Sequence, residues 1–225
     1  MGTLRHSPEW ASPSPDPDSR ELHPVARQDR KSQIHDAALS LFSERGYHGT
    51  GMEDIAQAIG MGASSLYNHM TSKQDLLAGI MLTTLDDLLT GFDRATSEGT
   101  PSQRLYRAMD THVRYHAEHR REARIGNREI PSLHQPAQDT VRNRRRSYAR
   151  RWEALIDDGV TAGEFSAEST RITAYALLEM GIGVAQWFRD EGPLSLDTVA
   201  AQYADMALRQ VGAAPRGVAV TPHEA

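Results

Sequence analysis

The sequence predicts an all-α protein of about nine helices, and three observations lead to this class. Apolar residues recur every three to four positions along most of the chain, which places them on one face of a helix. Residues 102–212 contain no alternating apolar and polar run of useful length, so strands are not expected there. Glycine, proline and capping residues divide the apolar segments into lengths typical of helices.

The composition excludes several classes of protein. The chain has 225 residues and no cysteine, which rules out disulfides, thiolate catalysis and cysteine metal sites. No apolar run approaches the ~18 residues of a membrane span, and the N-terminus lacks the apolar core of a signal peptide. We therefore expect a cytoplasmic protein with no membrane partner. The net charge of −5 does not exclude nucleic acid as a partner, because a local positive surface is sufficient.

The N-terminal part of the chain predicts an arm and a first helix. Residues 1–26 are rich in proline, serine and aspartate, which is typical of a disordered arm. Residues 27–45 follow as a helix that ends at Gly46. Its buried stripe consists of apolar residues at helical spacing: Ile34, Ala37, Ala38, Leu41 and Phe42.

Residues 46–77 predict two short helices joined by a tight turn. Thr50 and Glu53 form a T-x-x-E capping box at the first of these helices, and residues 60–62 (Gly-Met-Gly) end it. The second helix covers about residues 63–70, with Leu66 and Met70 able to face the core. The outer face is then polar and suits contact with phosphates and bases; it consists of Ser64, Ser65, Tyr67, Asn68 and His69. This order is that of a helix-turn-helix, whose second helix enters the major groove.

This segment resembles the DNA-binding domain of the TetR family of bacterial transcriptional repressors, over about residues 28–77. The sequence departs from the family pattern at Gly62, Ala63 and Met70, and none of these changes removes the fold signal. The residues that carry the resemblance are Gly46, Tyr47, Thr50, Asp54, Ile55, Ala56, Gly60, Leu66, Tyr67, His69, Ser72, Lys73 and Leu76.

The resemblance implies a set of DNA contacts from residues 27–76. The start of the first helix lies near the DNA backbone in this family, although simple solvation of its basic residues is an equal alternative. The predicted phosphate contacts are Arg27, Arg30, Lys31, Thr50, Ser65, Tyr67 and Lys73, and the predicted base contacts are Ser64, Asn68 and His69.

Residues 77–212 predict an α-helical effector-binding and dimerisation domain, reached by a long helix over residues 72–97. Thr71 or Ser72 caps this helix, and its far end enters the second domain, which provides a route for coupling. The last two helices, residues 167–190 and 195–211, carry too many apolar residues for lone amphipathic helices. In the family they form the dimer interface, and a monomeric core is the alternative. The predicted interface residues are Leu178, Ile182, Trp187, Phe188, Tyr203 and Met206. Residues 213–225 are expected to be a flexible tail.

Three histidines share one face of the helix predicted over residues 102–119. His112, His116 and His119 are one turn apart or less, a spacing that can bind zinc or nickel. A fourth ligand is not evident, and we expect no metal. The interpretation that we favour is that His112, Tyr115 and His116 supply polar points in an otherwise apolar effector pocket.

The helix over residues 137–162 carries six arginines outside its apolar stripe. Such a run is usually a solvated face, and the functional alternative is capture of an anionic effector by guanidinium groups. These residues are Arg142, Arg144, Arg145, Arg146, Arg150 and Arg151. The preceding segment, residues 123–130, could roof or floor a cavity.

Several strings in the C-terminal part resemble the effector domain of actinobacterial TetR-type repressors of steroid-ring and fatty-acid catabolism, namely residues 112–116, 126–129, 183–187, 192–195 and 203–205. Some members of that branch respond to acyl-CoA thioesters. The resemblance implies such an effector, with an uncharged hydrophobic drug or metabolite as the alternative, and no further cofactor. The predicted effector residues are Met109, His112, Tyr115, His116, Arg121, Arg124, Asn127, Trp152 and Met180.

Together these patterns predict a homodimeric repressor that binds a palindromic operator in double-stranded DNA and releases it when a small-molecule effector binds. An enzyme is not expected, since no Ser-His-Asp elbow, phosphate-binding loop or H-E-x-x-H motif is present. The alternative from another class is a helical protein-interaction module that does not bind DNA.

Overall fold

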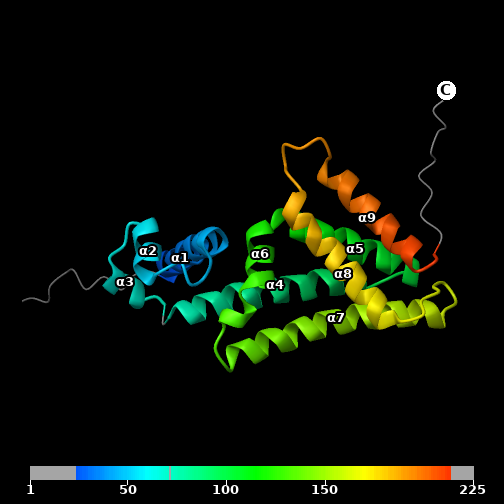
Figure 1. Ribbon diagram of the computed structural model, residues 1–225, viewed down its shortest axis with the longest axis horizontal. Helices are drawn as coiled ribbons and strands as arrows, with labels where there is room; N and C mark the ends of the chain where they lie inside the picture. The colour runs from blue at the N-terminus through cyan, green and yellow to red at the C-terminus, as the bar shows by residue number, and fades with distance from the viewer. Residues whose placement is uncertain (1–23, 71, 214–225) are drawn as a thin grey trace, which may run out of the picture.

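The computed structural model describes residues 24–70 and 72–213, with side chains from residue 30 onward. Within these residues it contains nine α-helices, one short 3-10 helix and no strand, which confirms the all-α class. Figure 1 shows the N-terminal helices gathered at one end, a second group of helices at the other end, and one long helix, α4 (Lys73–Ala95), running between them. The predicted arm (residues 1–26) and tail (213–225) lie almost wholly outside the described residues, as does the side chain of Arg27.

The first group consists of α1 (Pro24–Arg45), α2 (Met52–Ala58) and α3 (Ala63–Tyr67). Their apolar faces meet in one core that contains Ile34, Phe42 and Ile55, all nearly inaccessible to solvent. Leu66 is fully buried in the same core, whereas the adjacent Tyr67 is 56% exposed. The predicted faces of the second helix are therefore confirmed at these two positions.

The predicted capping box of α2 is wrong by one residue. The N-cap is Gly51, whose backbone N–H donates to the Asp54 carboxylate over 2.6 Å. The Thr50 hydroxyl instead lies 3.0 Å from the Gly46 carbonyl and 3.3 Å from the Leu41 carbonyl. Thr50 thus ties the end of α1 to the start of α2 because its hydroxyl satisfies carbonyls at a helix end.

Helix α4 (Lys73–Ala95) belongs to both parts of the molecule. The Ser72 hydroxyl accepts a hydrogen bond from the Asp75 N–H over 3.1 Å and caps it, as predicted. Residues such as Leu77 and Ile80 pack in the core of α1–α3, whereas Leu88 and Phe92 pack in a second core. A helix buried along its whole length in two cores is a stiff connection between them.

The second group consists of α5 (Pro101–Glu118), α6 (Arg120–Arg128), α7 (Ala137–Thr161), α8 (Thr170–Trp187) and α9 (Leu196–Gln210). The 3-10 helix η1 (Ile130–Ser132) follows α6. Helix α5 lies inside this group and packs against α8 and α9, and its central residues Leu105 and Met109 are fully buried. No helix of the described residues is long and apolar enough to cross a membrane.

Candidate DNA-binding face and ligand cavity

The exposed face of α3 and of the turn after it is polar. Ser64, Ser65, Tyr67 and Asn68 are exposed, and His69 is half-buried. Helix α3 ends at Tyr67, three residues before the predicted end. The chain continues as a turn, in which the N–H groups of His69 and Met70 both donate to the Leu66 carbonyl, over 2.9 and 3.1 Å. The polar side chains therefore stay on one surface, where hydroxyl, amide, phenol and imidazole groups can meet DNA.

Two of the predicted DNA contacts are engaged within the protein. Lys73 donates from Nζ to the carbonyls of Tyr47 (3.0 Å) and Thr50 (2.7 Å), and it lies 4.1 Å from the Tyr47 ring centroid. The Thr50 side chain is 1% exposed, so it faces the core and not a DNA phosphate. Arg30 and Lys31 are exposed near the start of α1, where Arg30 donates to Gln33.

Helix α4 and part of the second group of helices line a cavity of about 450 Å³. This volume lies in the range of pockets that bind small molecules. The helices α4, α5, α6, α7 and α8 all contribute to its wall. The α4 side is apolar, formed by Met81, Leu85 and Leu88 with Thr84, and Val141 and Ile182 add to it from α7 and α8.

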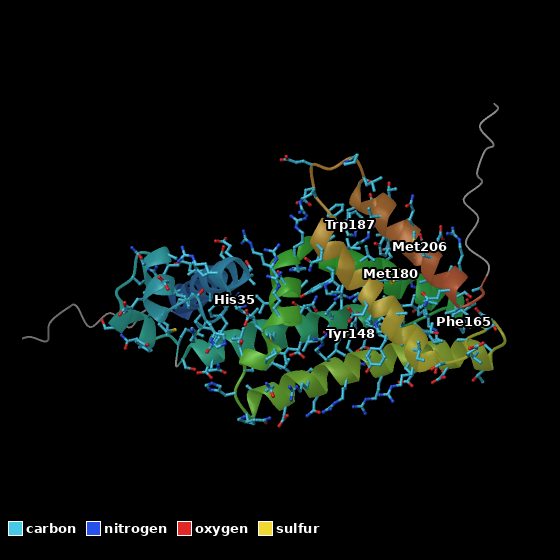
Figure 2. The ribbon with its side chains drawn as sticks, viewed as in Figure 1. His35, Tyr148, Phe165, Met180, Trp187 and Met206 are labelled. Carbon is cyan, nitrogen blue, oxygen red and sulfur yellow. The ribbon has the colours of Figure 1, made fainter. Side chains whose placement is uncertain are left out.

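His112 is held at the wall of the cavity by two hydrogen bonds. Its Nε2 donates to the Leu178 carbonyl over 3.1 Å, and its Nδ1 accepts from the Tyr148 hydroxyl over 3.0 Å, an assignment that follows from the carbonyl being an acceptor only. Burial lowers the pKa of His112 to about 4, so this imidazole is neutral at pH 7. Tyr148, labelled in Figure 2, belongs to α7, and Leu178 belongs to α8. The two hydrogen bonds of His112 therefore join α5 to both helices.

The close approach of α5 to α8 depends on Gly181. A Cβ added there would lie 2.2 Å from Cδ2 of His112, so any larger residue would displace the imidazole. Gly183, two residues further along the same helix, has open space around it. Glycine at 181 therefore lets His112 reach the Leu178 carbonyl.

His116 also lines the cavity but has a different environment. It is 4% exposed, and neither ring nitrogen has a hydrogen-bond partner among the described residues. Burial lowers the pKa of His116 well below its usual value, and the neighbouring His112, His119 and Arg145 add to this effect. Its ring is therefore a neutral imidazole with an unused donor and an unused acceptor.

Three arginines from α7 line the cavity: Arg142, Arg145 and Arg146. They are spaced i, i+3 and i+4, so they share one face of the helix. No carboxylate pairs with any of them among the described residues, whereas Arg144 and Arg151 on the same helix pair with Asp86 and Asp93 on α4. Two carboxylates, Glu122 and Glu179, also line the cavity without pairing with these arginines. Arg145 donates to the Gly126 carbonyl and Arg146 to the Asn143 side chain, so the site offers guanidinium groups whose charge no carboxylate neutralises by direct pairing, beside an apolar wall.

Of the nine predicted effector residues, the structure brings three to the cavity: His112, His116 and Asn127. Met109 and Trp152 are fully buried in the packed core, and Tyr115 and Met180 are partly buried beside it. Arg121 is exposed, and Arg124 donates towards the Ser43 carbonyl of α1. The resemblance and the helical periodicity indicate candidate residues, but they do not distinguish a side chain that lines a cavity from one that packs against other side chains. Arg142, Arg145 and Arg146 belong to the six arginines predicted as a group on α7, and nothing in the sequence distinguishes them from the other three.

His112, His116 and His119, the last at the C-cap of α5, are not arranged to share a metal ion. His119 is stacked on Tyr115 with ring centroids 4.2 Å apart, and His112 already uses both ring nitrogens. Within the described ranges, no group of three or more His, Asp or Glu side chains is arranged to hold a metal ion.

Helix α6 and the segment after it connect the cavity wall to the DNA-binding end. One side of α6 lines the cavity through Ala123, Gly126 and Asn127. At its end, the Glu129 carboxylate accepts a hydrogen bond from the Tyr47 N–H over 3.2 Å. Gln74 of α4 donates to the Ser132 carbonyl over 2.8 Å, which adds a second link between the two parts.

The surface of α8 and α9 carries exposed apolar side chains. Trp187 is 44% and Met206 is 41% exposed, and Figure 2 shows them on these two helices. Tyr203 is half-buried beside Trp187, with ring centroids 6.4 Å apart. Of the other predicted interface residues, Phe188 is buried in the chain's own core, and Leu178 and Ile182 line the cavity.

The chain matches two protein families over most of its described length. Residues 34–80 match the bacterial regulatory proteins of the tetR family, and residues 98–211 match the tetracyclin repressor-like C-terminal domain. The HTH-type transcriptional repressor KstR2 of Rhodococcus jostii (strain RHA1) is 30% identical over 189 residues, covering 80% of this chain and 89% of that protein.

Two solved structures illustrate the similarity of fold. A bacterial regulatory protein in the tetR family from Rhodococcus RHA1 has a TM-score of 0.77 at 30% identity, covering 82% of this chain and 97% of that one. AibR, solved in complex with isovaleryl coenzyme A and operator DNA, has a TM-score of 0.72 at 25% identity, covering 82% of this chain and 100% of that one.

Proposed function

Because this chain belongs to the TetR family of bacterial transcriptional regulators, we propose that it is a repressor that binds operator DNA as a homodimer and releases it when a small molecule fills the cavity. The observation that carries this proposal is that two walls of the cavity, α4 and α6, are also the helices that hold the DNA-binding end. A guest that changes the packing of these walls alters the position of α1–α3. The DNA target places this activity in the cytoplasm.

The DNA contacts come from α3 and the turn after it in this proposal. Ser64, Asn68 and His69 face base edges, while Ser65 and Tyr67 face phosphates. Lys73 and Thr50 act mainly by fixing the loop before α2, given their hydrogen bonds within the protein. Two copies of this face must lie about 34–36 Å apart, or a multiple of this, to enter successive major grooves.

The effector in this proposal is an acyl-CoA thioester. Such a ligand needs an apolar slot for its acyl group and cations for its phosphates. The wall formed by Met81, Leu85 and Leu88 supplies the first. Arg142, Arg145 and Arg146, which have no carboxylate partner among the described residues, supply the second. AibR, a protein of the same fold, was solved with isovaleryl coenzyme A, which supports this class of ligand.

A gel-shift assay tests the proposal in two stages. The full-length protein should bind the DNA upstream of its own gene, and the affinity should fall steeply with salt because several phosphates are neutralised. Octanoyl-CoA should then release the DNA, whereas free octanoate and free coenzyme A should not. Binding of the DNA without release by any thioester would contradict the effector class, and release by uncharged lipids would favour the hydrophobic alternative.

An arginine variant identifies the anionic subsite. Arg142→Ala together with Arg146→Ala should weaken thioester binding by about tenfold or more, because two charge-assisted contacts are lost. The matched control is Arg144→Ala with Arg151→Ala, which removes two arginines of the same helix that pair with α4. Equal loss in both variants would mean that the overall charge of α7, and not this site, attracts the ligand.

A further inference from the structure

We propose that the acyl group of the effector carries an oxygen function, a hydroxyl or a ketone, that hydrogen-bonds to His116 inside the cavity. This inference rests on the proposed function and narrows its ligand class. It follows from one side chain that is buried, polar, unpartnered and placed on the wall of the cavity.

The neighbouring histidines show that His116 is the exception on α5. His112 uses both ring nitrogens, with Leu178 and Tyr148. His119 is half-buried, stacks on Tyr115 and lies 3.4 Å from Glu122. His116 lies edge-on to His112 with ring centroids 4.5 Å apart, a contact that uses no hydrogen bond. The fold therefore provides partners for the two flanking imidazoles and leaves the middle one to the cavity.

The neutral imidazole of His116 determines which hydrogen-bonding groups a ligand needs in order to pair with it. It has one N–H donor and one nitrogen acceptor. A hydroxyl group can accept from the first or donate to the second, and a ketone can accept from the first. A saturated acyl chain can do neither, so it would leave a buried polar group unpaired next to it, which is unfavourable.

The rest of the wall makes this interaction selective. The wall from α4 is mainly apolar, because Met81, Leu85 and Leu88 face the cavity. Of the polar residues on the other helices, Tyr148 already donates its hydroxyl to His112. The guanidinium groups of α7 are donors only, and in the proposed function they bind the phosphates of the coenzyme. His116 is thus a buried side chain of the wall that gains a hydrogen bond when the acyl group carries oxygen.

The test is calorimetric titration of the full-length protein with acyl-CoA thioesters of one chain length. The panel comprises the saturated thioester and thioesters with a hydroxyl or a ketone at each successive carbon. At least one oxygenated thioester should bind about tenfold or more tightly than the saturated one, because it pairs the imidazole. If the saturated thioester binds as tightly as every oxygenated one, the inference is wrong and the proposed function stands. If no thioester binds, the proposed effector class fails and the inference fails with it.

Two variants identify the residue responsible. His116→Phe should abolish the preference for the oxygenated thioester, and His116→Leu provides the same test if the larger ring does not fit. The matched control is His119→Phe, the same change three residues further along at the C-cap of α5, which should keep the preference. The melting temperature of the unliganded His116→Phe protein should not fall, because no hydrogen bond is removed. A preference that survives in both His116 variants, or a large loss of stability in both, would assign His116 a structural role instead.

Discussion

Adjacent residues of α3 lie in opposite environments. Leu66 is fully buried, whereas Tyr67 is 56% exposed on the polar surface. Tyr67→Ala should therefore weaken operator binding by about tenfold or more, as expected for loss of a DNA contact of 1–3 kcal/mol, and leave thermal stability nearly unchanged. Fluorescence anisotropy with labelled operator, together with a melting curve, measures both effects.

The control for this prediction is the preceding residue. Leu66→Ala removes a fully buried side chain and should cost about 2–5 kcal/mol of stability. If Tyr67→Ala destabilised the protein as much as Leu66→Ala, the polar surface of α3 would be part of the core and the assignment of the DNA face would fail.

Two glycines of α8 should respond differently to the same substitution. Gly181→Ala places a Cβ 2.2 Å from the His112 ring, so it should displace the imidazole and cost about 1–3 kcal/mol. Gly183→Ala meets open space and should be neutral or stabilising by about 0.5–1 kcal/mol. Urea unfolding of both variants at one protein concentration makes the comparison. Equal effects would show that α5 and α8 can separate without cost.

Acid should destabilise the protein through its buried histidines. The pKa of His112 is about 4 in the folded chain and about 6.5 in the unfolded chain, so the unfolded state binds more protons between these values. Stability is then fully present above pH 6.5 and is lost as the pH falls towards 4, by about 2 kcal/mol between pH 7 and pH 5 for this group. His116, whose pKa is also lowered, acts in the same direction.

Urea unfolding at pH 7 and pH 5 checks this sign. The wild type should lose more stability than His116→Phe, which has one buried histidine fewer. An equal loss in the two proteins would mean that His116 does not remain neutral and buried in the folded state.

Among the helices, α6 contributes both to the cavity wall and to the contact with the DNA-binding end. It lines the cavity and its C-terminal end contacts α1–α3 through Glu129. Glu129→Ala removes the acceptor of the Tyr47 N–H, so operator binding should remain while the thioester concentration needed for half release rises about fivefold or more. A gel shift with increasing thioester measures this concentration.

A suitable control is Glu118→Ala, which removes an exposed carboxylate at the end of α5. Loss of operator binding in the Glu129 variant without any ligand would contradict this role, since the contact would then be needed to build the DNA-binding end.

The long helices could be predicted from sequence because their apolar stripes and caps agree. Ser72 caps α4 as expected, and α7 and α9 begin and end within about two residues of the predicted bounds. Helix α6 was seen only as a short mixed segment, since it has a single apolar pair in an arginine-rich stretch. The start of α2 was misplaced because Thr50 and Asp54 belong to two overlapping capping signals, and only the fold shows that the Thr50 hydroxyl turns towards α1.

The cavity could be predicted only in part. Spacing indicated that His112 and His116 face inward, but the difference between them depends on Tyr148 and Leu178, which come from α7 and α8. Met109 and Trp152 have the same helical periodicity as cavity residues, and they are packed against neighbours instead. Whether an inward-facing side chain lines the cavity or packs in the core depends on contacts between segments that are distant in the sequence. A single sequence does not show these contacts.

At the scale of the whole molecule, the apolar surface of α8 and α9 should hold two copies together. Trp187→Glu with Met206→Glu should leave the chain folded, because both side chains are exposed in the single chain, and should give monomers in analytical ultracentrifugation. Operator affinity should fall about a hundredfold or more, since the two half-sites would no longer be bound by one particle.

The control for the dimer prediction is Val160→Glu, which adds a charge at an apolar residue of α7 that is 39% exposed. This variant should stay dimeric. Dimers that persist in the double variant would place the interface on another surface.

The placement of α4 across both cores has a mechanical consequence. About 15 residues separate Leu88, beside the cavity, from Lys73, at the DNA-binding end, which corresponds to about 22 Å of helix. Pivoting this rod by about 8° at the inner end carries its outer end through about 3 Å, the length of one hydrogen bond. In a pair of subunits the two displacements add or cancel according to their directions. A small rotation of α4 around a guest is therefore large enough, at the DNA-binding end, to break contacts with a double helix.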